Sequence, residues 1–335
     1  MTKLFVAIFA AALFGALAPI PALADISSVC TGTGPGAGIV TACTALLASG
    51  KLDKDSQVVA LSSRGNAYEG LGQHQKAIDD YTAAIAIAPS ADLYFARAYA
   101  NEQMGQDTPA IADYTQAITL NANDVPALTR RGFAYLRGHD YVHAQADFNA
   151  ALTINPAAPF ALEGRGVSYV GLSKYDLATA DFTSIINAAP TADAYLSRAQ
   201  VEFYQAHWAD SAADFGHVLA LKPTDSSSLL WQHVALVRAG QSDPNFATAA
   251  AALDPQSFPG KVASFFLGKT DQQALFAVAS TGQLCAAEIF VGESFEMAKQ
   301  HGTAVINFQQ AINPSSPMCS YGTFEYQVAL TEMSR

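Results

Sequence analysis

The sequence has 335 residues, of which half are hydrophobic and only 14% are charged. Its 29 acidic and 18 basic residues give a net charge of −11, which argues against a nucleic-acid ligand because such binding depends on clustered Lys and Arg. The hydrophobic content is too high, and the charge too low, for a disordered chain, and favours closely packed helices.

The first 24 residues have the pattern of a secretory signal peptide. Lys3 precedes an apolar run over residues 4–17, and Ala22-Leu23-Ala24 forms a small-x-small cleavage site. The alternative is a membrane anchor, since an uncharged run of about 20 residues could span a bilayer, but Pro19 and Pro21 favour cleavage. No cysteine directly follows the cleavage site, as a lipoprotein would require. We therefore expect a soluble chain, secreted or periplasmic, with no membrane span after cleavage.

Residues 25–55 are expected to form a disulfide-clipped N-terminal cap. Four cysteines in an exported chain favour two disulfides over four buried thiols. Three pairings are possible, and we expect the local one, Cys30 with Cys43 and Cys285 with Cys319. The Gly-rich residues 31–38 lack the βαβ context of a dinucleotide loop, and apolar positions over residues 39–49 predict a cap helix.

An arginine recurs every 33 or 34 residues over residues 56–224, at positions 64, 97, 131, 165 and 198. In the first copy, helices are expected over residues 56–70 and 73–88, with Gly72 at the turn and Pro89 after the second helix. This period indicates a helix-turn-helix solenoid of about five repeats.

The repeat also carries a pattern of small and aromatic residues. In the first copy these are Gly65, Tyr68, Ala77, Tyr81, Ala84 and Pro89, and in the third they are Gly132, Tyr135, Ala144, Phe148, Ala151 and Pro156. The pattern resembles the tetratricopeptide repeat (TPR) family, although the second copy departs from it at Ala98, Asn101 and Ala122. The resemblance implies an all-α solenoid, a right-handed superhelix of antiparallel helix pairs, with capping helices at both ends.

Beyond residue 224 the pattern weakens. Residues 225–282 are expected to form degenerate helical repeats, with helices over 226–238, 245–253, 261–267 and 271–279. Residues 283–335 are expected to form a TPR-like pair, 283–300 and 303–312, and a closing helix, 323–333. Phe258-Pro259-Gly260, residues 266–270 and the final pair are similar to the NlpI-like periplasmic TPR adaptor lipoproteins, which dock envelope proteases and cell-wall hydrolases. The chain departs from that family in having no lipobox.

Each repeated arginine is accompanied by an aspartate that precedes the aromatic residue of the second helix: Asp80, Asp113, Asp147, Asp181 and Asp214. Because the two series share one period, we expect a ladder of ion pairs rather than ligand binding by the arginines.

Sequence motifs for catalysis are not evident. We find no Gly-x-Ser-x-Gly elbow, Walker loop or Ser-x-x-Lys signature. His139 and His143 have the spacing of a metal pair, but no third ligand lies near them in the sequence. We therefore expect a protein that is not an enzyme and that holds no metal or cofactor.

The first helix of each pair in such a solenoid lines a concave face. Helical phase places on this face the candidate partner-binding residues Asn66, Glu69, Phe95, Tyr99, Thr129, Phe133, Phe160, Glu163, Val167, Gln200 and Phe203. Aromatic residues rimmed by polar ones suit a peptide or a partner helix. The alternative is that some of them pack against neighbouring helices.

These observations predict a non-catalytic protein–protein interaction scaffold or adaptor of the bacterial periplasm or cell envelope. The partner would be another protein or peptide held in the groove. The alternatives are an enzyme with a cryptic site and a periplasmic protein that binds a small ligand. The lysine and asparagine clamp of chaperone-binding TPR domains is missing, so a chaperone C-terminal peptide is not expected.

Overall fold

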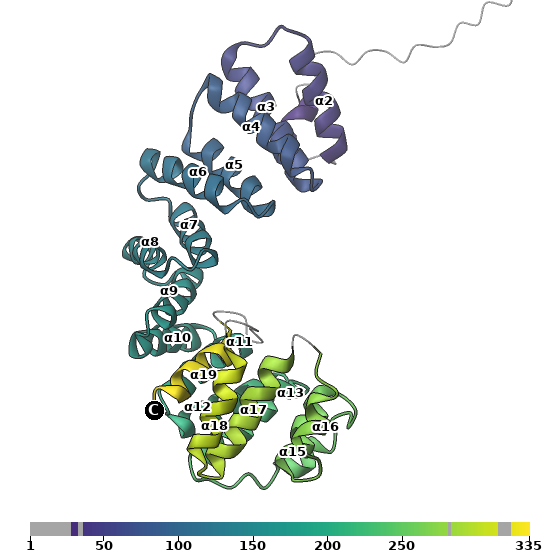
Figure 1. The fold of residues 1–335 in the computed structure, drawn as a ribbon. Coiled ribbons are helices and arrows are strands. Elements are labelled where there is room, and N and C mark those ends of the chain that lie inside the picture. The colour runs from purple at the N-terminus through teal and green to yellow at the C-terminus, as the bar shows by residue number, and fades with distance from the viewer. Residues whose placement is uncertain (1–27, 33–35, 281–282, 314–322) are drawn as a thin grey trace, which may run out of the picture. The chain divides into compact units, whose positions relative to one another are not determined.

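The computed structural model describes residues 28–32, 36–280, 283–313 and 323–335, and it shows a succession of helices joined by short turns (Figure 1). No strand occurs in these ranges, which confirms the predicted all-α class. No helix within them is long and apolar enough to cross a membrane. The predicted signal peptide lies outside the described residues and stays a prediction.

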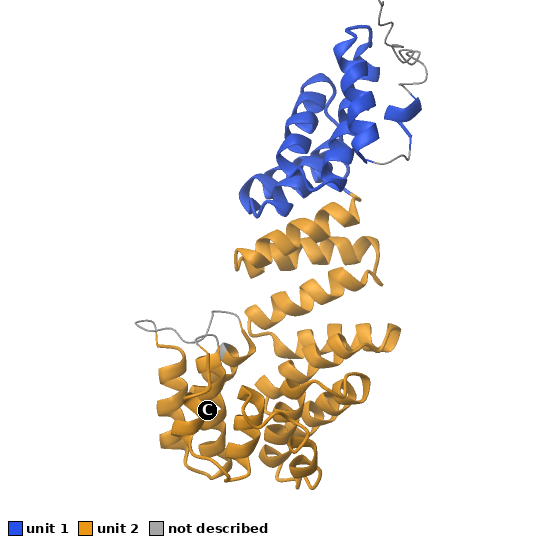
Figure 2. Ribbon diagram, turned by 90° about the vertical axis from the view of Figure 1, so that its right-hand side faces the viewer, with its two compact units in different colours: residues 1–122 blue, residues 123–335 orange. Residues whose placement is uncertain are grey.

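The chain divides into two compact units, residues 1–122 and 123–335 (Figure 2). From residue 36 onward in unit 1, helix α2 (Gly36–Ala48) is followed by two helix pairs: α3 (Lys54–Gly70), α4 (His74–Ile87), α5 (Ala91–Gln103) and α6 (Asp107–Leu120). Unit 2 opens with three further pairs: α7 (Val125–Arg137), α8 (Tyr141–Ile154), α9 (Pro159–Gly171), α10 (Tyr175–Ala188), α11 (Ala192–Tyr204) and α12 (Trp208–Leu221). It continues with less regular helices: α13 (Ser226–Arg238), α14 (Phe246–Ala250), α15 (Phe258–Phe266), α16 (Gln272–Phe276), α17 (Leu284–Met297), α18 (His301–Ala311) and α19 (Phe324–Met333).

The small and aromatic residues of the repeat meet where the two helices of a pair cross. A Cβ atom added to Gly65 on α3 would lie 2.6 Å from Cε1 of Tyr81 on α4. One added to Gly132 on α7 would lie 2.8 Å from Cε1 of Phe148 on α8. Since real side chains do not approach so closely, these glycines let the aromatic rings fill the space between the helices.

The predicted ion pairs are confirmed. Each repeated arginine donates from Nε and Nη2 to the two carboxylate oxygens of its aspartate, at 2.6–2.8 Å. Several of these arginines also donate from Nη1, at 3.0 Å, to a side chain on the preceding helix: Arg64 to Thr44, Arg97 to Thr82, Arg165 to Asn149 and Arg198 to Thr183. These four arginines therefore join the two helices of their own pair and tie that pair to the helix before it.

Helix α2 caps the first repeat, as the sequence predicts. A disulfide joins the buried Cys30 and Cys43, and Leu46 and Ala60 pack against them. Cys285 is buried on α17, but its predicted partner Cys319 lies outside the described residues, so that pairing stays a prediction.

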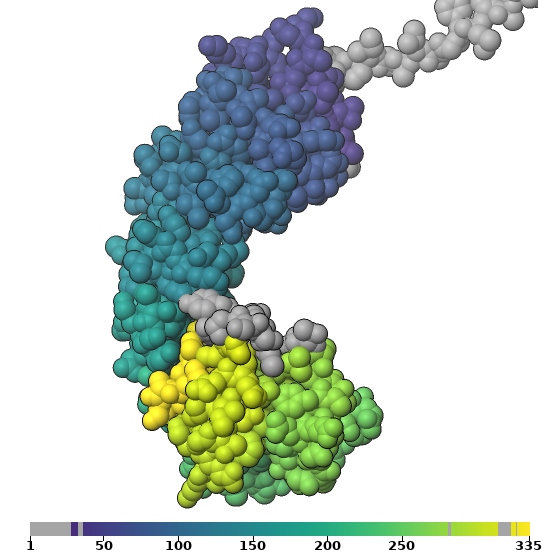
Figure 3. All heavy atoms as spheres, in the orientation of Figure 1, coloured from purple at the N-terminus to yellow at the C-terminus, as the bar shows by residue number. Residues whose placement is uncertain are grey.

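The C-terminal helices of unit 2 close around one core. Phe203, Trp231, Phe290 and Phe308 are all buried in it, together with other hydrophobic residues from the helices between α11 and α19. The green and yellow helices form a filled mass in Figure 3. The predicted helices 245–253 and 271–279 are shorter in the structure, as α14 and α16, because turn-type hydrogen bonds such as Leu253 N to Ala250 O replace the helical ladder at their ends.

Candidate partner-binding surface

The residues predicted to line a groove lie on the first helix of each pair, and all but one are at least partly exposed. In unit 1 they are Asn66, Glu69, Phe95 and Tyr99, on α3 and α5. In unit 2 they are Thr129, Phe133, Phe160, Glu163, Val167, Gln200 and Phe203, on α7, α9 and α11.

In unit 1 the predicted residues also hold their own repeats together. The hydroxyl of Tyr81 donates to Oδ1 of Asn66 at 2.7 Å, and a carboxylate oxygen of Glu69 lies 3.0 Å from Nδ1 of His74. Phe95 packs edge-on against Tyr114, with ring centroids 5.6 Å apart. These residues therefore pack against a neighbouring helix, as the alternative interpretation predicts, although each keeps some exposure.

In unit 2 three of the predicted residues line one pocket. Thr129, Phe133 and Phe160 face a cavity of about 440 Å³ between the N-terminal halves of α7 and α9. Its remaining walls are mostly small or apolar: Val125, Pro126, Arg130, Ala158, Pro159 and Ala161. A pocket of this size and character suits a bulky apolar side chain.

Phe160 is the most exposed large hydrophobic residue of the described part of the chain, at 67%. Phe133, by contrast, is half-buried and packs edge-on against Phe148, with ring centroids 5.2 Å apart. Phe133 therefore forms a fixed wall of the pocket. Phe160 leaves most of its ring in water, and a partner that covered it would remove that apolar area from solvent.

Glu163 lies one helical turn after Phe160 on α9, and its side chain is exposed. Partial burial raises the pKa of this carboxyl, and the negative charge of Asp193 on α11 raises the pKa further. Glu163 and Asp193 therefore both contribute negative charge to this part of unit 2. Gln200, the remaining predicted residue of α11 with any exposure, is half-buried.

The prediction that Phe203 lines the groove is wrong. This side chain is 1% exposed and packs edge-on against Trp208, Trp231 and Phe324, with centroids 4.7–5.8 Å apart. Helix α19 brings Phe324 against Phe203 and Tyr204 at the end of α11. The chain thus fills this part of the predicted groove with its own C-terminal helix.

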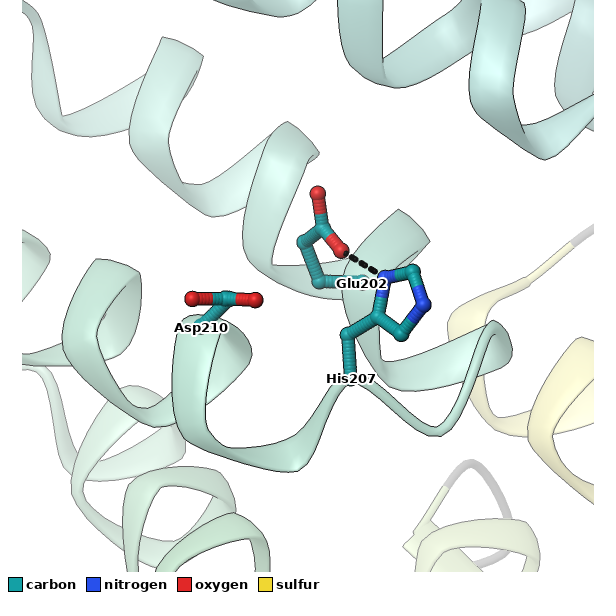
Figure 4. Close-up of side chains that lie close together, drawn as sticks. All are labelled: Glu202, His207 and Asp210. Atoms are coloured by element: carbon teal, nitrogen blue, oxygen red, sulfur yellow. Dashed lines mark hydrogen bonds and ion pairs between the residues drawn. The ribbon is translucent and has the colours of Figure 1, made fainter.

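One group in the described part of the chain could offer three metal ligands: Glu202, His207 and Asp210, whose ligand atoms lie within 4.8 Å of one another (Figure 4). Nδ1 of His207 lies 2.7 Å from Oε2 of the buried Glu202. The same pairing, with the same spacing of five residues, recurs at two other turns, in Glu69 with His74 and Glu296 with His301. Because the pair recurs at these turns without a third ligand among the described residues, we interpret it as a link between the two helices of a repeat.

The two histidines with metal-pair spacing have separate neighbours. Nδ1 of His139 lies 3.1 Å from the hydroxyl of Tyr141, and Nδ1 of His143 lies 2.6 Å from Oδ2 of Asp140. His139 also occupies the turn with a φ of 57°, at the position that glycine holds in the first repeat. Both imidazoles therefore belong to the local structure of the turn.

Sequence reasoning missed the pocket residues at the start of α7 and α9. Pro126 and Pro159 lie in the first turns of these two helices, which open successive pairs, one repeat period apart. Proline suits a first turn because the N–H that it lacks would have no partner in the helix. Prolines recurring at the repeat period were the signal that could have located this end of the pocket.

The chain is similar to known TPR proteins. Residues 58–90 and 91–124 match the family description "Tetratricopeptide repeat", and these matches coincide with the pairs α3–α4 and α5–α6. No curated protein matches the chain. The resemblance of the C-terminal part to the NlpI-like lipoproteins stays a prediction.

Solved structures with a similar fold include a TPR protein from Parabacteroides merdae, which is 19% identical with a TM-score of 0.54 over 82% of this chain and 98% of that one. PilF of Pseudomonas aeruginosa is 18% identical with a TM-score of 0.51 over 65% of this chain and 99% of its own. YrrB, described as a TPR protein with an unusual peptide-binding site, is 14% identical with a TM-score of 0.50 over 57% and 97%. At these identities the similarity establishes the fold, which is the predicted TPR solenoid.

Proposed function

We propose that this chain, a tetratricopeptide repeat protein, is a non-catalytic scaffold that binds a segment of another protein in the pocket between α7 and α9. The observation that carries the proposal is the exposure of Phe160, 67%, at the edge of an apolar cavity of about 440 Å³. Large exposed aromatic residues beside a preformed pocket are typical of protein interaction sites.

The fold supports the proposal. TPR proteins act mainly by binding peptides or proteins, and the structurally similar YrrB is described as having a peptide-binding site. In the present chain the pocket walls come from two successive repeats, Phe133 on α7 and Pro159 and Phe160 on α9. Since the repeat packing fixes both helices, the pocket is preformed, and a partner would lose little free energy in ordering it.

We further propose that the protein acts outside the cytoplasm, in the bacterial periplasm or envelope. The signal-peptide pattern of residues 1–24 supports export. The disulfide between Cys30 and Cys43 suits an oxidising compartment. Mass spectrometry of the protein from its native source tests export: a chain that begins at Asp25 is expected, and an intact Met1 terminus in a cytoplasmic fraction would contradict it.

The binding role is tested by crosslinking in envelope extract with wild type, Phe160→Ala and Val142→Ala. Val142 is a matched control, because it is 64% exposed on α8, the second helix of its pair. We expect a specific protein to be captured by wild type and Val142→Ala and lost with Phe160→Ala, while helical circular dichroism is unchanged in all three. Equal capture by the folded Phe160→Ala variant would place the binding site elsewhere.

A further inference from the structure

Helix α9 presents a mixed stripe that continues beyond the pocket. Phe160, Glu163 and Val167 follow one another at intervals of three and four residues, and all three are exposed, Phe160 at 67% and Val167 at 41%. Residues at these intervals lie on one face of a helix. A partner whose apolar side chain enters the pocket therefore meets Glu163 about one turn along α9.

The negative charge at Glu163 is not matched by a basic side chain in the described part of the chain. No ion pair to Glu163 is present in those residues, and the charged group that acts on its pKa is the negative Asp193. Lys222 pairs with Asp193 at 2.7 Å and not with Glu163. The surface next to the pocket is thus complementary to a positive charge.

In the next repeat of unit 2, a helix of the chain itself packs against α11. The C-terminal end of α11 is covered by α19, whose Phe324 lies against Phe203 and Trp231 with centroids 5.8 and 4.7 Å apart. Beyond the end of that helix, Arg335 donates to the backbone carbonyl oxygens of Phe203 and Tyr204. A helix anchored by an aromatic ring therefore already packs against the first helix of the next pair.

We propose that the partner segment is an amphipathic helix that inserts a large apolar side chain into the α7–α9 pocket and pairs a Lys or Arg, about one turn away, with Glu163. This inference rests on the proposed function and specifies its partner. The proposed site differs from the end of α11 that α19 covers in offering an unmatched carboxylate.

The test is a selection from a phage-displayed library of random peptides of about 16 residues, long enough for about four helical turns. Wild type is the bait. The enriched peptides are then synthesised, and their affinities are measured for Phe160→Ala, Glu163→Gln, Glu163→Lys and two controls, Val142→Ala and Asp210→Asn. Asp210 is a carboxylate exposed on α12, so its variant removes the same charge away from the pocket.

We expect enriched peptides with an apolar residue and a Lys or Arg three or four positions apart. Their affinity falls at least about tenfold with Phe160→Ala and about fivefold with Glu163→Gln, and the controls are unchanged. Glu163→Lys favours the same peptides with Glu in place of the basic residue. The peptides gain helical circular dichroism on binding. A proline placed in the centre of a peptide abolishes its binding, because proline breaks the helix.

The outcomes separate the two proposals. Peptides that depend on Phe160 but carry no basic residue, do not respond to Glu163→Gln, or bind in an extended form overturn this inference and leave the pocket as a binding site. Peptides that bind Phe160→Ala as tightly as wild type contradict the proposed function itself, as does a selection that enriches no peptide.

Discussion

Arg165 and Asp181 form a two-pronged ion pair between the two helices of one repeat. Nε of Arg165 donates to Oδ2 at 2.8 Å and Nη2 donates to Oδ1 at 2.7 Å, while Nη1 reaches Oδ1 of Asn149 on the preceding helix at 3.0 Å. Asp181 is only 5% exposed. A planar guanidinium can make all three bonds at once, which the flexible ammonium of lysine cannot do in the same geometry.

Replacing this arginine is expected to destabilise unit 2 strongly. Arg165→Ala leaves the Asp181 carboxylate buried without its partner, and breaking a buried ion pair on one side costs about 3 kcal/mol. Lys222→Ala is the control, since it breaks the Lys222–Asp193 pair, which is largely exposed and is worth less than about 1 kcal/mol. Urea unfolding of the two variants measures both values. Equal losses in the two would show that the repeated pair contributes no more than a surface ion pair.

The glycines of α3 give opposite expectations within one helix. A Cβ at Gly65 would lie 2.6 Å from the ring of Tyr81, whereas nothing lies within 4 Å of a Cβ at Gly70. Gly65→Ala is therefore expected to lower the free energy of unfolding by about 1–3 kcal/mol through overpacking. Gly70→Ala is expected to leave it unchanged or to raise it by up to about 1 kcal/mol, because alanine favours helix. Thermal unfolding followed by circular dichroism compares them, and a stabilising Gly65→Ala would mean that the Tyr81 ring moves aside at little cost.

The repeat could be predicted from sequence because its determinants are local. Gly65, Tyr81 and the Arg–Asp pairs all act within one helix hairpin, and each recurs at a fixed period, so their pattern carries both the fold and the contacts. The burial of Phe203 could not be predicted in this way, because it depends on Phe324, which lies far along the chain and outside the repeat pattern.

The candidate surface was predicted only in part for the same reason. Helical phase identified Phe133 and Phe160 as outward-facing, but it could not distinguish the ring that packs on Phe148 from the one that is left in water. It also assigned residues of two separate units to one groove. The pocket instead takes its walls from two helices of unit 2, α7 and α9. Which exposed positions share a pocket depends on the packing of successive pairs.

The disulfide of the cap is expected to stabilise unit 1. It joins Cys30 to Cys43 across 13 residues of sequence, and closing a loop of this length is worth about 3 kcal/mol by restricting the unfolded chain. A Cys30→Ser and Cys43→Ser double variant should therefore exchange the amide protons of α2 faster than wild type, with α9 unaffected. Hydrogen exchange measures this region by region. Unchanged protection in α2 would show that packing of Leu46 alone holds the cap.

Helix α17 carries two carboxylates in the core of unit 2. Glu293 is fully buried, and Nη1 of Arg238 donates to its Oε2 at 2.7 Å. Glu288 is 6% exposed, and its Oε2 has no hydrogen-bond partner within the described residues. Burial raises the pKa of Glu288 to about 7 and that of Glu293 to about 6, with the positive charge of Arg238 opposing the second shift. Burial therefore shifts the titration of both groups to a higher pH in the folded protein than in the unfolded chain.

The stability of unit 2 is expected to fall as the pH rises from about 5 to about 8. Between the ordinary pKa of 4.5 and the folded value of about 7, folded Glu288 keeps a proton that the unfolded chain has released, so the free energy of unfolding decreases with pH. Glu288→Gln removes this contribution, which is on the order of 2 kcal/mol, and should flatten the pH profile of urea unfolding. Asp210→Asn, which removes an exposed carboxylate, should leave the slope as it is in wild type. Parallel profiles for wild type and Glu288→Gln would contradict the prediction, because they would mean that the pKa of Glu288 is the same in the folded and the unfolded chain.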